Sequence, residues 1–303
     1  MVEKIELTFL GTGSSIPTLR RNHPAVLLKY KAENILVDCG EGTQRQFRKA
    51  GLNPCKVTKI LISHWHGDHV LGLPGLLQTL NVNGYNGELV IYGPKGSKGK
   101  FQDMVVPYLP AREMNYDIVV KECRDGVIFD SDEFVIEVVE VDHGCPAVAY
   151  SFVVKEKKRL DKEKLVKLKI PNSPLVGELV KGKIVEIGGK KIDGKKLMYV
   201  EPQRKVSFVM DTQKCEGALK IAKGADVLIS EATYSKEDQD IAGEHGHMSS
   251  VDAASIAKKA KVKALILIHL SQRYEGIPKV ILNEAKEVFE DVIIPEDLEG
   301  IEL

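Results

Sequence analysis

The residues best suited to do chemistry lie in one short stretch, His64-Trp65-His66-Gly67-Asp68-His69, which directly follows an apolar run. It places three imidazoles and one carboxylate within six positions, and these are ligand types that zinc takes in proteins. A polar loop without a metal is the alternative, but imidazoles crowded together gain nothing unless a cation lies between them. We therefore interpret the stretch as part of a metal site. In a tight loop relieved by glycine, His64 and His66 can face one ion while Asp68 and His69 turn toward a neighbouring ion.

Three further candidate ligands occupy matching positions, each at the carboxyl end of a predicted strand. They are His143 after residues 134–141, Asp211 after 206–210 and His269 after 264–268. In layered α/β folds the strand ends share one edge, so residues distant in the sequence converge there. Either histidine alone would be an ordinary strand-end residue. Together with the cluster at 64–69 the set exceeds what one tetrahedral zinc uses, which suits two metals about 3.5–4 Å apart that share a carboxylate, and Asp211 is the natural bridge.

This ligand order resembles the metallo-β-lactamase fold, in its dinuclear hydrolase branch. The resemblance implies an α/β protein built as a four-layer αββα sandwich, with the metals at one edge of the two sheets. Thioesterases, lactonases, sulfatases and nucleases all share the cluster, so it specifies the fold better than the substrate.

The elements that must position these residues follow from hydrophobic periodicity. The predicted strands are 5–10, 25–30, 34–37, 57–62, 89–92, 134–141, 206–210, 226–230 and 264–268, and the predicted helices are 41–49, 70–80, 250–260 and 280–290. Gly51 suits a left-handed cap after the first helix. We interpret residues 1–303 as a single domain that carries a protruding insertion at about 155–200, with a helical piece at 161–169 followed by a glycine-punctuated ribbon.

Charge is distributed unevenly along a chain whose net charge is zero. Between Lys155 and Lys205 there are 16 Lys/Arg and 7 Asp/Glu, a local balance of +9. A concentrated basic segment in a neutral protein indicates a surface for a polyanion such as nucleic acid. The five cysteines include no Cys-x-x-Cys pair, which favours a reducing cytoplasm over a disulfide framework. No apolar run approaches the roughly 18 residues needed to span a bilayer, so no membrane association is expected.

Several longer stretches narrow the resemblance to the ribonuclease Z family, whose members remove 3′ trailers from precursor tRNA. They are FLGTGSSIPTLRRNHPA, VDCGEGTQRQF, SEATY, HGHMSS and HLSQRY, together with the basic insertion, which resembles that family's flexible arm. The resemblance implies two Zn²⁺ per subunit, a homodimer, no nucleotide cofactor, and a precursor tRNA substrate gripped by the arm. It also implies products with a 3′-hydroxyl on the tRNA and a 5′-phosphate on the trailer. One departure follows His143, where GCPAVAY replaces the family's Ser-Tyr-Gly-Tyr-like residues and puts local substrate contacts in doubt.

Roles for individual residues follow from the chemistry and the resemblance. Asp68, with one oxygen on metal and one free, can orient the nucleophile and accept its proton. The resemblance assigns His247 as the acid for the leaving 3′ oxygen, held protonated and oriented by Glu231. It also assigns Arg273 and Tyr274 to substrate binding.

Simpler explanations compete at several positions. Glu231 at a strand end and His245 in a loop could be solvated surface, and we treat His245 as incidental. Gly11 and Gly13 follow a strand as in a dinucleotide loop, but no helix with a third glycine follows. The stretch YGPKGSKGK at 92–100 could bind phosphate, although a solvated loop before a helix is the simpler interpretation.

Two other functions compete with RNA cleavage. A metallo-β-lactamase-fold hydrolase of small esters, sulfates or lactones has no need of the +9 segment. The other alternative is a non-catalytic RNA-binding protein whose metals only stabilise the fold. Such a protein needs neither a bridging carboxylate nor an open coordination position. Incubation with a 3′-extended precursor tRNA separates the three.

Overall fold

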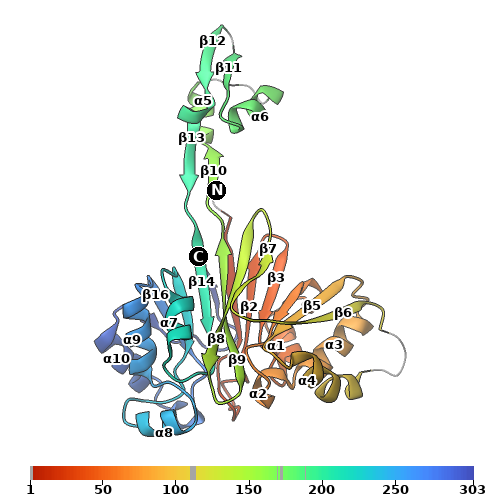
Figure 1. Cartoon of the computed structure of the whole chain (residues 1–303), viewed down its shortest axis with the longest axis vertical. Helices are drawn as coiled ribbons and strands as arrows, with labels where there is room; N and C mark the ends of the chain where they lie inside the picture. Colours follow the sequence, from red (N-terminus) through yellow and green to blue (C-terminus); the bar gives the residue numbers. More distant parts are fainter. Residues whose placement is uncertain (1–2, 110–113, 169, 171–172, 188) are drawn as a thin grey trace.

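The computed structural model describes residues 3–109, 114–168, 170, 173–187 and 189–303. Two large sheets lie face to face and helices cover the outer side of each, so the body has four layers (Figure 1). The predicted αββα sandwich is therefore confirmed. Within the described residues no helix is long and apolar enough to cross a membrane.

The first sheet has the strand order β18-β1-β2-β3-β4-β5-β6. Neighbours from β3 to β6 are parallel, and the pairs from β18 to β3 are antiparallel. Its strands are β1 (Ile5–Gly11), β2 (Ala25–Tyr30), β3 (Glu33–Val37), β4 (Lys59–Leu61), β5 (Glu88–Gly93), β6 (Asp117–Glu122) and β18 (Gly300–Glu302).

The second sheet has the order β17-β16-β15-β14-β9-β8-β7. Neighbours from β14 to β17 are parallel, and the pairs from β7 to β14 are antiparallel. Its strands are β7 (Gly126–Asp130), β8 (Phe134–Asp142), β9 (Pro146–Val154), β14 (Arg204–Val209), β15 (Val227–Glu231), β16 (Ala264–Ile268) and β17 (Val292–Ile293).

Helices of the body connect these strands. They are α1 (Thr43–Lys49), α2 (Gly67–Val70), α3 (Leu73–Val82), α4 (Ser97–Met104), α7 (Glu216–Ala222), α8 (Gln239–Glu244), α9 (Ser250–Ala260) and α10 (Lys279–Val288), with 3-10 turns η1 (Pro54–Lys56), η2 (Val106–Tyr108) and η4 (Gln272–Tyr274). Ser249, which precedes α9, forms a capping box with Asp252, and this satisfies free amides of the first turn. Gly51 after α1 has φ +67, as its predicted left-handed cap requires.

The central core lies between the two sheets because alternate side chains of each strand face inward. Leu7 and Phe9 of β1 belong to the same core cluster as Ile136 and Val138 of β8. Burying one such side chain contributes roughly 1.5–3 kcal/mol relative to leaving it exposed. Two further apolar clusters lie under the helices, one on the outer face of each sheet. The sandwich thus holds its strand ends in fixed relative positions.

One prediction of local structure is wrong, and several strands were not predicted. The helix predicted at 70–80 is two helices, α2 and α3, because the chain turns at Gly72 against the loop after β3. The amide of Gly72 donates to the Cys39 carbonyl at 2.9 Å, and a Cβ there would lie 2.0 Å from the Gly40 carbonyl oxygen. Strand β9 was not predicted, since nearly all its residues are buried and it shows no polar alternation. Strands β6 and β7 also fall in a stretch expected to be mostly loop.

The segment that follows β9 leaves the body as a long projection and returns into β14 (Figure 1). It consists of β10 (Lys157–Leu160), α5 (Lys162–Lys167), α6 (Pro174–Val180), β11 (Ile184–Ile187), β12 (Lys190–Asp193), η3 (Gly194–Leu197) and β13 (Met198–Glu201). Strands β10 and β13 pair as an antiparallel stalk, and Leu179 and Leu197 are buried near its tip. Parts of the predicted helix and ribbon, at 169, 171–172 and 188, lie outside the described residues.

Candidate metal centre and active site

One edge of the sandwich collects the candidate chemistry. Strands β3, β4, β8, β14, β15 and β16 all point their carboxyl ends toward this edge, which lies opposite the projecting segment (Figure 1). The residues at or just after these ends are Asp38, His64, His143, Asp211, Glu231 and His269. Their convergence follows from the shared strand direction, as expected for a site at the ends of parallel strands.

Asp211 lies at the centre of four imidazoles. Its Oδ2 is 3.2 Å from His69 Nε2 and 3.7 Å from the Nε2 atoms of His64 and His143. Its Oδ1 is 3.1 Å from His269 Nε2. A single buried carboxylate that faces ligands on both sides has the geometry of a bridge between two cations.

The ligand atoms fall into two principal groups. Within each, the ligand atoms lie within 4.8 Å of one another: His64, His66 and His143 form one group, and Asp68, His69, Asp211 and His269 form the other. In the first group His66 Nδ1 is 3.2 Å from His143 Nε2. In the second, Asp68 Oδ2 is 3.3 Å from His69 Nε2 and 3.4 Å from His269 Nε2. The cluster at 64–69 is thus divided between the groups in the way its spacing suggested.

Unsatisfied buried atoms test whether these residues fit metal ions. His64 Nε2, His69 Nε2 and Asp211 Oδ1 are buried, and although other polar atoms of the cluster lie 3.1–3.7 Å away, none of these contacts with the described residues has the geometry of a hydrogen bond. Each buried polar group left unpaired costs about 1–3 kcal/mol. All three atoms point into the same cluster of nitrogen and oxygen donors, which is the donor set of a catalytic zinc site. The residues therefore fit a pair of divalent cations.

Three of the ligand imidazoles form a hydrogen bond through Nδ1, on the side of the ring away from the metal centre. The contacts are His69 to Asp38 Oδ2 at 2.7 Å, His143 to the Gly246 carbonyl oxygen at 2.7 Å and His269 to Thr233 Oγ1 at 2.8 Å. Such contacts set the tautomer and aim the free Nε2 lone pair at the metal. Sequence reasoning missed all three partners, although Asp38 carried a signal because it directly follows a predicted strand.

Asp38 holds two ligands at once. It is fully buried, and its carboxylate accepts hydrogen bonds from the amide and hydroxyl of Ser63, at 2.7 and 2.8 Å. The same hydroxyl lies 3.0 Å from His64 Nδ1 and accepts a hydrogen bond from it, since the hydroxyl donates its own hydrogen bond to Asp38. Asp38 therefore orients His69 directly and His64 through Ser63. Its own backbone has φ +57, a left-handed conformation that the surrounding bonds maintain.

His269 also has a left-handed backbone, with φ +61. The next residue, Leu270, donates its amide to the Thr12 carbonyl at 3.1 Å and accepts from the Ser14 amide at 3.2 Å. The glycine-rich N-terminal stretch therefore positions a ligand. Gly11 permits this packing, because a Cβ there would lie 1.8 Å from the His23 carbonyl oxygen.

Electrostatics at the centre favour a cation. Burial lowers the pKa of His69, but the Asp211 and Asp38 carboxylates outweigh it and raise that pKa well above its ordinary value. Burial, together with neighbouring His69, lowers the pKa of His64, so its imidazole is neutral and keeps a lone pair. For Asp68, burial opposes ionisation, yet the adjacent His269 and His69 imidazoles hold its pKa below the ordinary range. Asp68 and Asp211 stay ionised at neutral pH.

His247 and Glu231 form a pair beside the ligands. His247 Nδ1 lies 3.1 Å from Glu231 Oε1 and 4.0 Å from Asp211 Oδ2. Burial lowers the pKa of His247, but the Glu231 charge and hydrogen bond overcome this and raise it to about 9. The imidazole is therefore charged at neutral pH in this arrangement.

Glu231 is completely buried and fully engaged rather than solvated. Its oxygens accept from the Thr212 amide at 2.7 Å, the Met248 amide at 3.1 Å and the Thr233 hydroxyl at 2.7 Å. Since Thr233 in turn accepts from His269, Glu231 orients both the charged His247 and a candidate metal ligand. The surface explanation for Glu231 is wrong, while His245 is exposed.

Arg273 and Tyr274 occupy different environments. The Tyr274 side chain is buried, and its hydroxyl donates to Asp238 and accepts from the Ser235 amide at 3.0 Å, so it supports the loop after β15. The Arg273 guanidinium is half exposed and stacks over the Tyr234 ring, 5.8 Å from its centroid. Arg273 alone of the two offers its polar end to a ligand.

Comparison with known proteins is consistent with this geometry. A family model described as Anti-Pycsar protein Apyc1 matches residues 5–160, and one described as Beta-lactamase superfamily domain matches residues 197–270. Proteins named Ribonuclease Z from Methanothermobacter thermautotrophicus and Bacillus licheniformis are 38% and 39% identical to the chain. These alignments cover 99% and 95% of this chain and 97% and 96% of the relatives.

Two solved structures resemble the chain over nearly its whole length. The short form of human tRNase Z superposes with a TM-score of 0.69 at 28% identity, over 98% of both chains. YhfI from Bacillus subtilis, a metallo-β-lactamase fold protein, gives 0.72 at 21% identity over 99% of this chain and 100% of its own, which supports the fold.

Fold and ligand set together define a hydrolase of the metallo-β-lactamase superfamily. The first family model reaches only the front half of the chain, whereas the ribonuclease Z relatives align with nearly all of it. The chain belongs to the ribonuclease Z family of endoribonucleases, and the family predicted from its motifs is confirmed.

Proposed function

We propose that the protein is a zinc-dependent endoribonuclease that cleaves the 3′ trailer from precursor tRNA. The observation that carries this proposal is the joint presence, at one edge, of two ligand groups bridged by Asp211 and a charged His247–Glu231 pair. The relatives named Ribonuclease Z and the tRNase Z structure supply the substrate class.

The donor set is suited to two Zn²⁺ ions per subunit, held by His64, His66 and His143 on one side and by Asp68, His69, Asp211 and His269 on the other. Bound there, the ions would lower the pKa of a water molecule and neutralise charge on the phosphoryl oxygens.

Asp68 and His247 carry out the proton transfers of the reaction. Asp68 orients the attacking water and accepts its proton, because its carboxylate is ionised and one-tenth exposed at the rim of the ligand cluster. The water oxygen forms a bond to phosphorus and the bond from phosphorus to the 3′ oxygen breaks. His247 gives its proton to that leaving oxygen and Glu231 stabilises the imidazolium beforehand. The products are a tRNA with a 3′-hydroxyl and a trailer with a 5′-phosphate.

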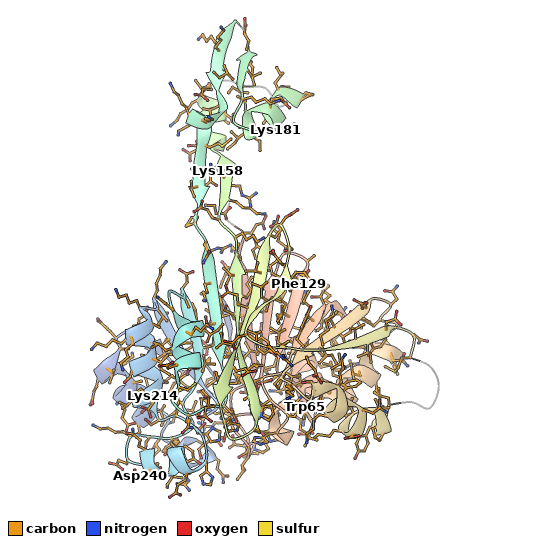
Figure 2. The ribbon with its side chains drawn as sticks, in the orientation of Figure 1. Trp65, Phe129, Lys158, Lys181, Lys214 and Asp240 are labelled. Atoms are coloured by element: carbon orange, nitrogen blue, oxygen red, sulfur yellow. The ribbon has the colours of Figure 1, made fainter. Side chains whose placement is uncertain are left out.

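Residues 155–200 act in this proposal as an arm for the tRNA body within a single-domain protein. Lys158 and Lys181, on the stalk and tip, lie far from Trp65 beside the ligands (Figure 2). Strands β9 and β14 run between the arm and the ligand edge, so one arm points away from its own active site. In a homodimer, each arm holds a tRNA that the other subunit cuts, so an arm need not reach its own active site. The five free cysteines are suited to a reducing cytoplasm.

Cleavage of a 3′-extended precursor tRNA by the zinc-loaded protein tests the proposal, with the cut mapped at nucleotide resolution. We expect one cut at the end of the tRNA body and a 5′-phosphate on the released trailer. The function is wrong if the loaded protein hydrolyses a small ester or phosphodiester but leaves precursor tRNA intact.

The arm is tested by replacing residues 161–197 with a short Gly/Ser turn, which keeps the β10–β13 stalk. We expect unchanged zinc content and unchanged hydrolysis of a small phosphodiester, because no candidate ligand lies in the segment. Precursor tRNA binding should weaken and depend less steeply on salt, since fewer counterions are released. Normal processing would show the arm to be dispensable. Loss of the small substrate in a folded protein would place the arm in the active site.

A further inference from the structure

A second group of cations borders the active site, away from the arm. Lys95 precedes α4 and Lys98 and Lys100 lie in its first turn; all three are exposed, and we refer to them as the α4 ridge. None of the three forms an ion pair with a residue that the structure describes. Two acidic residues are close by, Glu122, which accepts from the Lys98 amide at 3.2 Å, and Asp103 within α4. The ridge therefore keeps a net positive charge.

A direct contact connects the ridge to the metal ligands. Trp65, which stands between His64 and His66 in the chain, donates its indole N–H to Ser97 Oγ at 2.7 Å. Ser97 is buried at the first position of α4, inside the ridge sequence. The packing is tight, since a Cβ on Gly93 would lie 2.4 Å from that same Oγ.

Because Trp65 is flanked in the chain by His64 and His66, its contact with Ser97 places the ridge beside the ligand group of His64, His66 and His143.

The direction of the bound RNA follows from the acid. Under the function proposed above, on which this inference rests, His247 protonates the 3′ oxygen of the tRNA's last nucleotide. The tRNA end must therefore approach over His247 and the nearby Tyr234 ring, which Arg273 covers. The scissile phosphate stays with the trailer, whose chain must leave the centre on another side. Trp65 and the ridge border the side formed by the ligand group that includes His66, which is exposed.

We propose that the α4 ridge binds the backbone phosphates of the 3′ trailer, downstream of the cut. The occupant is the single-stranded trailer because the ridge lies beside the centre and offers three exposed, flexible ammonium groups, which suit sequence-independent phosphate contact. This assigns the YGPKGSKGK stretch to substrate binding, where its phosphate-binding interpretation had been the less simple one.

The test compares precursor tRNAs that carry trailers of one and ten nucleotides, cleaved by the parent and by Lys95→Gln/Lys98→Gln/Lys100→Gln. A one-nucleotide trailer has no phosphate beyond the scissile one, so it cannot reach the ridge. A matched control, Lys258→Gln/Lys259→Gln/Lys286→Gln, removes the same charge from exposed positions on α9 and α10. Melting curves and zinc content establish that each variant is intact.

We expect the ridge variant to raise KM for the ten-nucleotide trailer on the order of tenfold at 50 mM salt and to leave the one-nucleotide substrate unchanged. The slope of log affinity against log salt should fall by about 2 for the long trailer, at roughly 0.7 per phosphate contact. The control should match the parent on both substrates. Equal effects on both trailers, or no effect on either, would overturn the inference while leaving the proposed function standing. Failure of the parent to cleave either precursor would refute the function itself.

Discussion

Replacing Asp38 by Asn tests whether the metal centre depends on a residue that never contacts the metal. The carboxylate accepts three hydrogen bonds, from the Ser63 amide at 2.7 Å, the Ser63 hydroxyl at 2.8 Å and His69 Nδ1 at 2.7 Å. Asparagine has nearly the same shape but carries a donor on one side. If its oxygen keeps the Ser63 amide, its NH₂ faces the other two donors.

Relief of that conflict requires the protons to move. His69 must shift its proton from Nδ1 to Nε2, the atom aimed at Asp211 and the metal. The Ser63 hydroxyl must also turn, which removes the acceptor that holds His64. Loss of such an outer contact costs 10–100-fold in metal affinity, which is about 1.4–2.7 kcal/mol. Because Asp38 supports a ligand in each group, we expect a loss near the upper value.

Zinc affinity is best measured by competition with a chromophoric chelator, with melting of the metal-free protein as the folding check. Asp226→Asn serves as the control, since Asp226 accepts from the Lys205 amide at 2.7 Å at the opposite end of the sheet. The control should bind zinc like the parent. If Asp38→Asn also binds zinc like the parent, the orienting role derived from its contacts is refuted.

Three other substitutions separate the roles at the centre. Asp211→Ala should remove the bridge and lower both metal content and activity, and two zincs per chain with normal turnover would contradict the ligand assignment. Asp68→Ala should lower kcat by about 10²–10⁴-fold with little change in KM, whereas a loss confined to tRNA binding would exclude it as the base. His247→Ala should slow RNA cleavage but spare a nitrophenyl phosphodiester, whose leaving group needs no proton, and equal losses on both would rule out the acid. Because burial lowers and Glu231 raises the pKa of His247, to about 9, the parent's rate on RNA should fall above about pH 9 as the imidazolium deprotonates. That decline should be absent from the variant.

Much of this site is already determined by the sequence, for a local chemical reason. Metal ligands must be residues of a few types, and the spacing at 64–69 is too dense in them to serve another purpose. His143, Asp211 and His269 were identifiable because each follows a strand whose periodicity is readable, and parallel strands place such positions at one edge. The αββα sandwich and the family were predicted from the resemblance of these residues and the longer motifs to a known family.

Contacts between distant segments decided the rest. Strand β9 was not predicted from the sequence because a strand buried on both faces shows no alternation of apolar and polar residues. The break between α2 and α3 depends on the close approach of the loop at Gly40. Asp38 and Thr233 acquire their roles only when folding brings them behind His69 and His269. Tyr274 turned out to be an internal support, because the loop after β15 takes up its hydroxyl. Such roles depend on which atoms face one another across the fold, and one-dimensional patterns of residue type carry no information about that.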